Sequence, residues 1–223
     1  MNAPLPADLP EAATAALLHV EGLGVAIART DGEEVRPVDG VNFAIAAGET
    51  FALLGESGCG KSMTALALMG LQPDGARLGG SIRLDGEELI GRDEAAWCRI
   101  RGRRIAMVFQ EPMTALNALF TVGDQIAEVL ELHEGLSKAA AREVAVQLLA
   151  DTGIPEPARR AQAFPHQLSG GQRQRAMIAM ALACGPRLLL ADEPTTALDV
   201  TLRGQILDLL ESLRHRKGMA VLV

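Results

Sequence analysis

The chain has 223 residues, 48% of them apolar, and its 21 Lys and Arg against 28 Asp and Glu give a net charge of −7. This acidic balance argues against a general nucleic-acid binder, which usually carries a basic face. Cys59, Cys98 and Cys184 are widely separated and form no CxxC pair, so they indicate neither a disulfide framework nor a zinc site. A reducing, cytosolic setting is therefore expected.

The first 18 residues are rich in Pro and Ala and are expected to form a mobile tail. The first Lys or Arg is Arg29, so the N-terminus lacks the charged region of a signal peptide. No apolar run approaches the roughly 18–20 residues that span a bilayer. We expect a soluble protein whose membrane role, if it has one, comes through a partner.

Strands and turns are predicted from about His19 to Leu89. Alternating apolar residues in 41–45 indicate a half-buried strand that ends near Gly48, and Asp85-Gly86 indicates a hairpin. The period then changes to that of amphipathic helices, over residues 123–135 and 137–153. Ser137 is the expected N-cap of the second helix, and Gly153 its expected end.

Four apolar runs predict core strands of a parallel sheet: residues 50–54, 104–109, 187–191 and 219–223. Helical patterns at 61–70 and 172–185 lie between them, and this alternation predicts an α/β fold. Ligands of open parallel sheets bind beyond the carboxyl ends of the strands. The residues that follow each run are therefore the candidates for chemistry.

After the first run comes GESGCGKS, residues 55–62, which matches the phosphate-loop pattern G-x-x-x-x-G-K-[ST]. Glycines let a loop point successive N–H groups at phosphates, and the following helix N-terminus adds positive charge. Lys61 is expected to reach the β- and γ-phosphates, and the Ser62 hydroxyl to ligate Mg²⁺. The alternative is a Gly-rich turn that caps a helix.

Polar residues also follow the second and third runs. Asp192 is placed to hold Mg²⁺ through water, and Glu193 to polarise the attacking water, although two helix-capping acids before Pro194 would look the same. Gln110 can touch Mg²⁺ or the water and sense the γ-phosphate. Its alternative is a surface glutamine at a strand end.

Five motifs in this order, GESGCGKS, VFQEP, LSGGQ, LLLADE and TALD, resemble the Walker A, Q-loop, signature, Walker B and D-loop of ABC-type ATPases. The resemblance covers about residues 20–223. It implies a phosphate-loop NTPase with a RecA-like parallel core, an antiparallel β subdomain and an inserted α-helical subdomain. The implied boundaries are 19–223 for the ATPase domain, with 19–110 and 168–223 as core and 111–167 as helical subdomain.

In this family two subunits face each other head to tail, and each ATP lies between one phosphate loop and the other subunit's signature. The resemblance implies catalytic roles for Lys61, Gln110 and Glu193, and Mg²⁺ ligands Ser62, Gln110 and Asp192. It implies that the nucleotide contacts are Gly55, Glu56, Ser57, Gly58, Cys59, Gly60, Lys61, Ser62, Met63, Ser169, Gly170, Gly171, Gln172 and Asp199.

The stretches VFQEPMTALN, FPHQLSGGQRQRAMIAMAL and ADEPTTALDVTLRGQIL look like ATP-binding subunits of oligopeptide, dipeptide and related importers. That resemblance implies a second ATPase subunit, two integral membrane permease subunits on the helical subdomain and, indirectly, an extracytoplasmic binding protein. It also implies a peripheral location at the cytoplasmic face of the membrane, and no nucleic-acid partner.

Three departures from the pattern stand out. The chain has no Tyr, and Arg29 or Arg36 replaces the usual aromatic as a candidate to stack on adenine. Ala118 follows Asn117 where these importers usually have Pro. Residues 219–223 predict a core strand at the very end of the chain, before the family's switch histidine, so we expect a C-terminally truncated chain that binds ATP with little hydrolysis.

Two other features have competing explanations. Cys59 is either a reactive thiol or a small filler in the phosphate loop. Trp97, in a run with Arg99, Arg101, Arg103 and Arg104, suggests either a nucleic-acid site or, as we expect, a solvated edge near the membrane subunits. Alternative functions are a soluble ABC ATPase of DNA repair or chromosome organisation and an ATP-binding chain without turnover.

Overall fold

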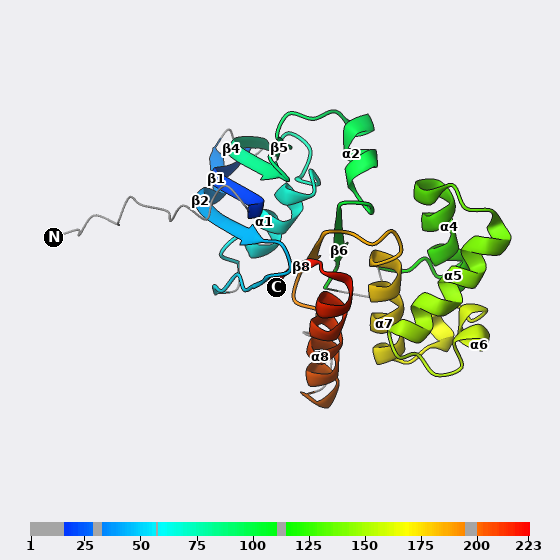
Figure 1. The fold of residues 1–223 in the computed structure, drawn as a ribbon. Coiled ribbons are helices and arrows are strands. Elements are labelled where there is room, and N and C mark those ends of the chain that lie inside the picture. The colour runs from blue at the N-terminus through cyan, green and yellow to red at the C-terminus, as the bar shows by residue number, and fades with distance from the viewer. Residues whose placement is uncertain (1–15, 29–32, 57, 111–114, 195–199) are drawn as a thin grey trace.

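The computed structural model describes residues 16–28, 33–56, 58–110, 115–194 and 200–223, with no side chains for 200–202. These residues form two four-stranded sheets with helices packed against them (Figure 1). The antiparallel sheet has the order β2 (Glu34–Ala46), β1 (Ala16–Ala28), β4 (Arg77–Leu84) and β5 (Glu87–Glu88). The parallel sheet has the order β3 (Thr50–Phe51), β8 (Ala220–Leu222), β7 (Leu188–Ala191) and β6 (Ile105–Val108).

The antiparallel sheet follows the predicted pattern. Asp85 and Gly86, at φ 53° and 78°, join β4 to β5, and two consecutive positive φ angles are what a tight type I′ hairpin requires. Strand β1 begins at Ala16, earlier than the expected start of the domain at residue 19. Leu18 is fully buried, which explains why the strand includes it.

The four predicted core strands are confirmed, and each neighbouring pair in that sheet is parallel. Successive residues of a strand point to opposite faces. Ile105 and Met107 of β6 accordingly join the core shared with the antiparallel sheet, whereas Ala106 and Val108 join a second core under α7 and α8. Burial on both faces explains why these strands appear as continuous apolar runs.

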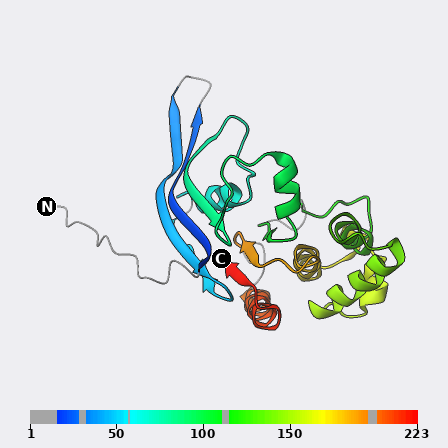
Figure 2. The same ribbon diagram turned by 45° about the horizontal axis from the view of Figure 1, so that its top comes forward.

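The helices divide between the two sides of the parallel sheet. Helix α1 (Lys61–Leu68) packs between the sheets, and α7 (Gly170–Ala181) and α8 (Val200–Lys217) cover the other face (Figure 2). Beyond α7 lie α4 (Val122–Glu134), α5 (Lys138–Asp151) and α6 (Pro157–Ala161), in a third core of their own (Figure 1). Helix α7 contributes to both the second and third cores, so it links the helical unit to the sheet.

Helix ends agree closely with the sequence. Ser137 is the N-cap of α5 and accepts a hydrogen bond from the Ala140 N–H, as predicted. The chain reverses after α5 at Gly153, with φ 75°. Helix α7 ends at Ala181, slightly before the expected end near Cys184.

The expectation of a solvated edge at Trp97 is wrong. Trp97, on α2 (Glu94–Ile100), is only 6% exposed and belongs to the main core. Arg101 lies over its ring, 5.1 Å from the centroid, and donates hydrogen bonds to the Met69 and Gly70 carbonyls. The arginine run therefore includes a structural cation that fastens α2 to the end of α1, which sequence spacing alone does not distinguish from a surface charge.

We predict that Trp97→Ala lowers the free energy of unfolding by about 3–5 kcal/mol, because it removes a large buried ring. Urea denaturation followed by circular dichroism measures the change. Arg99→Ala, at an exposed position of the same helix, is the control and is expected to stay within about 0.5 kcal/mol of wild type. A Trp97→Ala loss no larger than the control's would contradict the assigned burial.

Candidate functional site

The phosphate-loop sequence joins β3 to α1 at the carboxyl edge of the parallel sheet. Gly58 and Gly60 have φ angles of 81° and 98°, a region that residues with a Cβ avoid. Gly60 is also the N-cap of α1, and a Cβ there would lie 2.2 Å from the Pro37 carbonyl oxygen of β2. The loop thus needs glycine at position 60 for two independent reasons, conformation and space. Ser57 lies outside the described residues.

Lys61, the first residue of α1, folds back over the loop. Its Nζ donates hydrogen bonds to the carbonyl oxygens of Gly55, at 2.8 Å, and Glu56, at 3.0 Å. The ammonium group is therefore held inside the loop, at the end of α1 where the first N–H groups lack intrahelical acceptors. A cation and a helix N-terminus together favour an anion at this position.

Ser62 and Asp192, 130 residues apart in sequence, meet at this edge. The Ser62 Oγ donates a hydrogen bond to Asp192 Oδ1 at 3.0 Å. Asp192 follows β7 directly, and its N–H bonds the Val108 carbonyl at the end of β6, which fixes its backbone. A hydroxyl and a carboxylate are oxygen donors of the kind that Mg²⁺ prefers, so the pair suits that ion.

A second pair forms beside the first. The Gln110 Nε2 donates a hydrogen bond to Glu193 Oε2 at 3.1 Å, and both side chains are exposed. Glu193 has a positive φ of 44°, an uncommon conformation for a residue with a Cβ that is often found at functional sites. Lys61, Asp192 and Glu193 line one small pocket of about 110 Å³ that also includes Val223.

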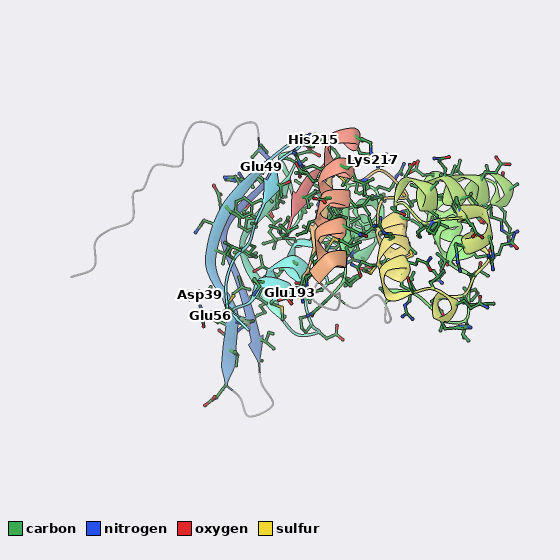
Figure 3. The ribbon with its side chains drawn as sticks, turned by 90° about the horizontal axis from the view of Figure 1, so that it is seen from below. Asp39, Glu49, Glu56, Glu193, His215 and Lys217 are labelled. Carbon is green, nitrogen blue, oxygen red and sulfur yellow. The ribbon has the colours of Figure 1, made fainter. Side chains whose placement is uncertain are left out.

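Figure 3 shows Glu193 at the end of the molecule where Glu56 of the loop lies, with Glu49 and His215 at the opposite end. His215 pairs there with Glu211 at 3.0 Å. This placement puts His215 away from the phosphate loop.

The signature residues form a separate structure at the start of α7. Ser169 is its N-cap, and Ser169 and Gln172 satisfy each other's backbone N–H groups through a capping box at 3.3 and 3.1 Å. Ser169 and Gly170 are exposed, whereas Gly171 is buried. Among the described residues, those that line the Lys61 pocket include none from α7. Asp199 lies outside the described residues.

The remaining predicted contact residues are placed as follows. Cys59 is exposed, and its Sγ lies against Gly55, where a Cβ would come within 2.4 Å. Met63 is half-buried against the main core. Arg36 pairs with Glu34 at 2.9 Å, and Arg29 lies outside the described residues.

Sequence reasoning missed the four buried polar residues of the described part, which are Thr64, Gln125, Thr152 and Gln174. Thr64 is 3% exposed and donates from its Oγ1 to the Gly60 carbonyl at 3.0 Å, which ties α1 to the end of the loop. Gln125 is 8% exposed in α4. A threonine and a glutamine inside amphipathic patterns look like surface residues, and only their burial reveals a role.

The fold and the loop define a phosphate-loop α/β protein. The family model described as ABC transporter matches residues 38–196, and the chain belongs to this family. The oligopeptide transport ATP-binding protein OppD of Mycobacterium tuberculosis is 52% identical over 208 residues, which cover 93% of this chain and 34% of that protein. OppD of Salmonella typhimurium is 48% identical over 222 residues, or 100% of this chain and 64% of that protein.

A solved structure is also similar. The ATP-binding cassette MJ0796, as a dimer in a post-hydrolysis state bound to ADP and Pi, aligns with a TM-score of 0.79 and 31% identity over 92% of this chain and 86% of that one. The expected fold class is thereby confirmed. The chain spans between a third and two thirds of the length of the two OppD relatives. None of the helices in the described part is long and apolar enough to cross a membrane.

We predict that Gly60→Ala destabilises the protein far more than Gly58→Ala. Both variants strain a positive φ at a cost of about 1–2 kcal/mol, but only the first also pushes a Cβ into a β2 carbonyl. Thermal unfolding of both variants gives the comparison, and equal losses would contradict the close contact between loop and strand.

Proposed function

We propose that the chain is the ATP-binding and ATP-hydrolysing part of an ABC importer for peptides or related small substrates. Its family membership and the names of its relatives support this proposal. The observation that carries it is the meeting of two side-chain pairs, Ser62–Asp192 and Gln110–Glu193, next to Lys61 at one edge of the sheet.

ATP binds with its phosphates in the loop. Lys61 meets the β- and γ-phosphate oxygens, and the loop N–H groups and the start of α1 surround them. Ser62 and Asp192, with Gln110, hold Mg²⁺, which when bound neutralises phosphate charge. The proposed contacts on this side are residues 55–63, of which 57 is outside the described part.

Glu193 acts as the general base. Its carboxylate takes a proton from the water that attacks the γ-phosphorus, and the products are ADP and phosphate. Gln110 donates a hydrogen bond to one carboxylate oxygen of Glu193, which helps to orient the base. The amide of Gln110 orients the base but carries no charge, so it can release the water or Mg²⁺ at little cost when the γ-phosphate leaves. Gln110 can therefore also sense whether the γ-phosphate is present.

A second subunit completes each site. In a head-to-tail dimer, Ser169, Gly170, Gly171 and Gln172 of one chain contact the ATP held by the other, and Asp199 crosses the same interface. The N–H groups of Gly170 and Gly171 lie in the first turn of α7, where intrahelical acceptors are lacking, and they suit a γ-phosphate. Exposed Ser169 and Gly170 are accessible to such a partner.

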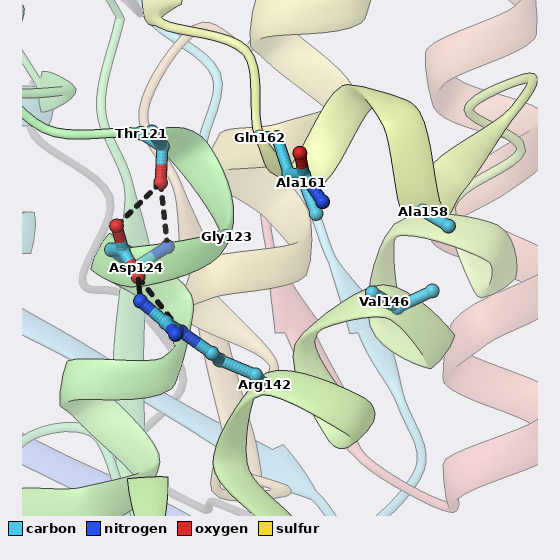
Figure 4. Close-up of a pocket in the computed structure, with 8 residues that line it drawn as sticks. All are labelled: Thr121, Gly123, Asp124, Arg142, Val146, Ala158, Ala161 and Gln162. Carbon is cyan, nitrogen blue, oxygen red and sulfur yellow. Dashed lines mark hydrogen bonds and ion pairs between the residues drawn. The ribbon is translucent and has the colours of Figure 1, made fainter. Parts of the chain in front are cut away.

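The helical unit α4–α6 receives the two membrane subunits at the cytoplasmic face of the membrane, and an extracytoplasmic binding protein delivers substrate to them. Leu119 and Phe120, just before α4, are 81% and 55% exposed, an unusual exposure for neighbouring large apolar residues. A pocket of about 410 Å³ lies between α4, α5 and α6 (Figure 4).

Lys61→Ala is predicted to weaken MgATP binding by about a hundredfold, because charge-assisted hydrogen bonds to phosphate are lost. Isothermal titration calorimetry measures the affinity. Lys138→Ala, which removes an exposed lysine at the start of α5, is the control and should bind as wild type does. Full affinity in Lys61→Ala would contradict the phosphate-loop assignment.

In a full-length chain, Glu193→Gln is predicted to keep MgATP affinity and to reduce turnover by at least about a hundredfold, since an amide cannot accept the proton. It should also trap an ATP-bound dimer on size-exclusion chromatography. Glu49→Gln, at the opposite end of the molecule, serves as the control (Figure 3). Unchanged turnover in Glu193→Gln removes this residue as the base.

A further inference from the structure

The C-terminal end of α5 is only partly closed by its own chain. The last four carbonyls of a helix have no intrahelical partner. The Ile154 N–H donates to the Leu149 carbonyl at 3.0 Å, and the Gly153 N–H donates to the Ala150 carbonyl at 2.8 Å. With Gly153 at a φ of 75°, these two bonds form the Schellman motif that commonly ends helices. This motif satisfies two of the four carbonyls and leaves two.

Two arginines from outside the helical unit satisfy the remaining carbonyls. The Arg175 Nη1 of α7 donates to the Thr152 carbonyl at 2.7 Å. The Arg216 Nη2 of α8 donates to the Asp151 carbonyl at 3.3 Å. The helix dipole favours cations at a helix C-terminus, and α5 has no basic residue in its own last turn. All four carbonyls therefore have partners, but two of them depend on α7 and α8.

The contact between Arg175 and the end of α5 is closely fitted. Thr152 is only 1% exposed, and a Cβ on Gly153 would lie 2.9 Å from the Arg175 Nη1. The guanidinium also donates through Nη2 to the Gln205 Oε1 of α8 at 3.3 Å. Beside this contact, α5 and α7 share the third core, to which they contribute the fully buried Ala141, Ala145, Ala176 and Ala179.

We infer that Arg175 is a positioning residue that fixes α7 to the end of α5, so that residues 169–171 have the orientation that the nucleotide-bound dimer needs. This inference rests on the proposed function. Arg175 lies about two helical turns from Ser169 in the same helix, so a rotation of α7 at Arg175 moves the signature directly. Its guanidinium acts through α7 and does not touch the nucleotide.

Loss of this contact leaves the buried Thr152 carbonyl without its partner and lets α7 sample other orientations. Only chains with the signature in the competent orientation can close on the ATP of a second subunit. The apparent affinity of the dimer therefore falls with the fraction of competent chains. The phosphate loop of a single chain binds MgATP without α7, so that affinity stays the same. These two affinities separate a positioning role from a general loss of folding.

The test uses a full-length chain that carries Glu193→Gln, in which MgATP is expected to trap the dimer. Arg175→Met removes the guanidinium but keeps a long side chain. Gly153→Ala keeps the arginine and places a Cβ against its Nη1. Gly135→Ala is the control, because Gly135 ends α4 at a φ of 67° and a Cβ there would meet no atom within 4 Å. It reproduces the backbone strain of Gly153→Ala without the contact.

Analytical ultracentrifugation at saturating MgATP measures the dissociation constant of the dimer, and microscale thermophoresis at a lower protein concentration measures MgATP affinity. Arg175→Met and Gly153→Ala are each expected to weaken the dimer about tenfold, the effect of about one charge-assisted hydrogen bond, with MgATP affinity unchanged. The double variant should be no weaker than Arg175→Met, since both changes act on one contact. Gly135→Ala should match the parent.

Equal dimer affinity in Arg175→Met and the parent overturns the inference and leaves the proposed function standing. Additive losses in the double variant also overturn it, because they show that the two residues act through separate contacts. A matching loss of MgATP affinity, or an equal loss in Gly135→Ala, has the same consequence. If the Glu193→Gln parent forms no MgATP-dependent dimer, the dimer of the proposed function is wrong, and the role of Arg175 is wrong with it.

Discussion

The hydrogen bond from the Ser62 hydroxyl to the Asp192 carboxylate joins the phosphate loop to the acidic residues that follow β7. Ser62 starts α1 after β3, and Asp192 follows β7, with β8 between those strands. The two residues meet because the parallel strands β3 and β7 end at the same edge of a sheet, and that sheet is buried on both faces. The hydrogen bond between Ser62 and Asp192 therefore depends on three features together: the apolar core, the glycine-rich loop and the acidic residue that follows β7.

The chain separates this site from the signature residues at the start of α7. Ser169 and Gly170 are exposed at a helix end with a complete capping box, so their structure is stable without a ligand. A helix tip of this kind suits a phosphate, and the proposed function assigns to it the phosphate that another chain carries. Helix α7 packs on both the sheet and the helical unit, so movement of α4–α6 relative to the sheet would shift the signature as well.

Much of the fold and part of the site could be predicted because short-range rules decide them. The apolar runs gave the parallel strands, Asp85-Gly86 gave the hairpin, and the phosphate-loop spacing located Lys61 and Ser62. Interactions between residues far apart in the sequence could not be predicted in this way. Trp97 was predicted to lie on a solvated edge because its neighbours are charged, but Arg101 folds over its ring.

Gln125 was overlooked because its burial depends on how α4 packs against its neighbours. Ser57 and Asp199 lie outside the described residues, and the roles of all the predicted site residues stay predictions.

The most direct test of the central claim is the structure of the MgATP-bound dimer, determined with a non-hydrolysable ATP analogue. The account predicts that the Ser169 Oγ of each subunit lies within about 3 Å of a γ-phosphate oxygen on the nucleotide held by Lys61 of the other. A closed, nucleotide-bound dimer in which residues 169–171 remain exposed to solvent and away from the triphosphate would contradict it.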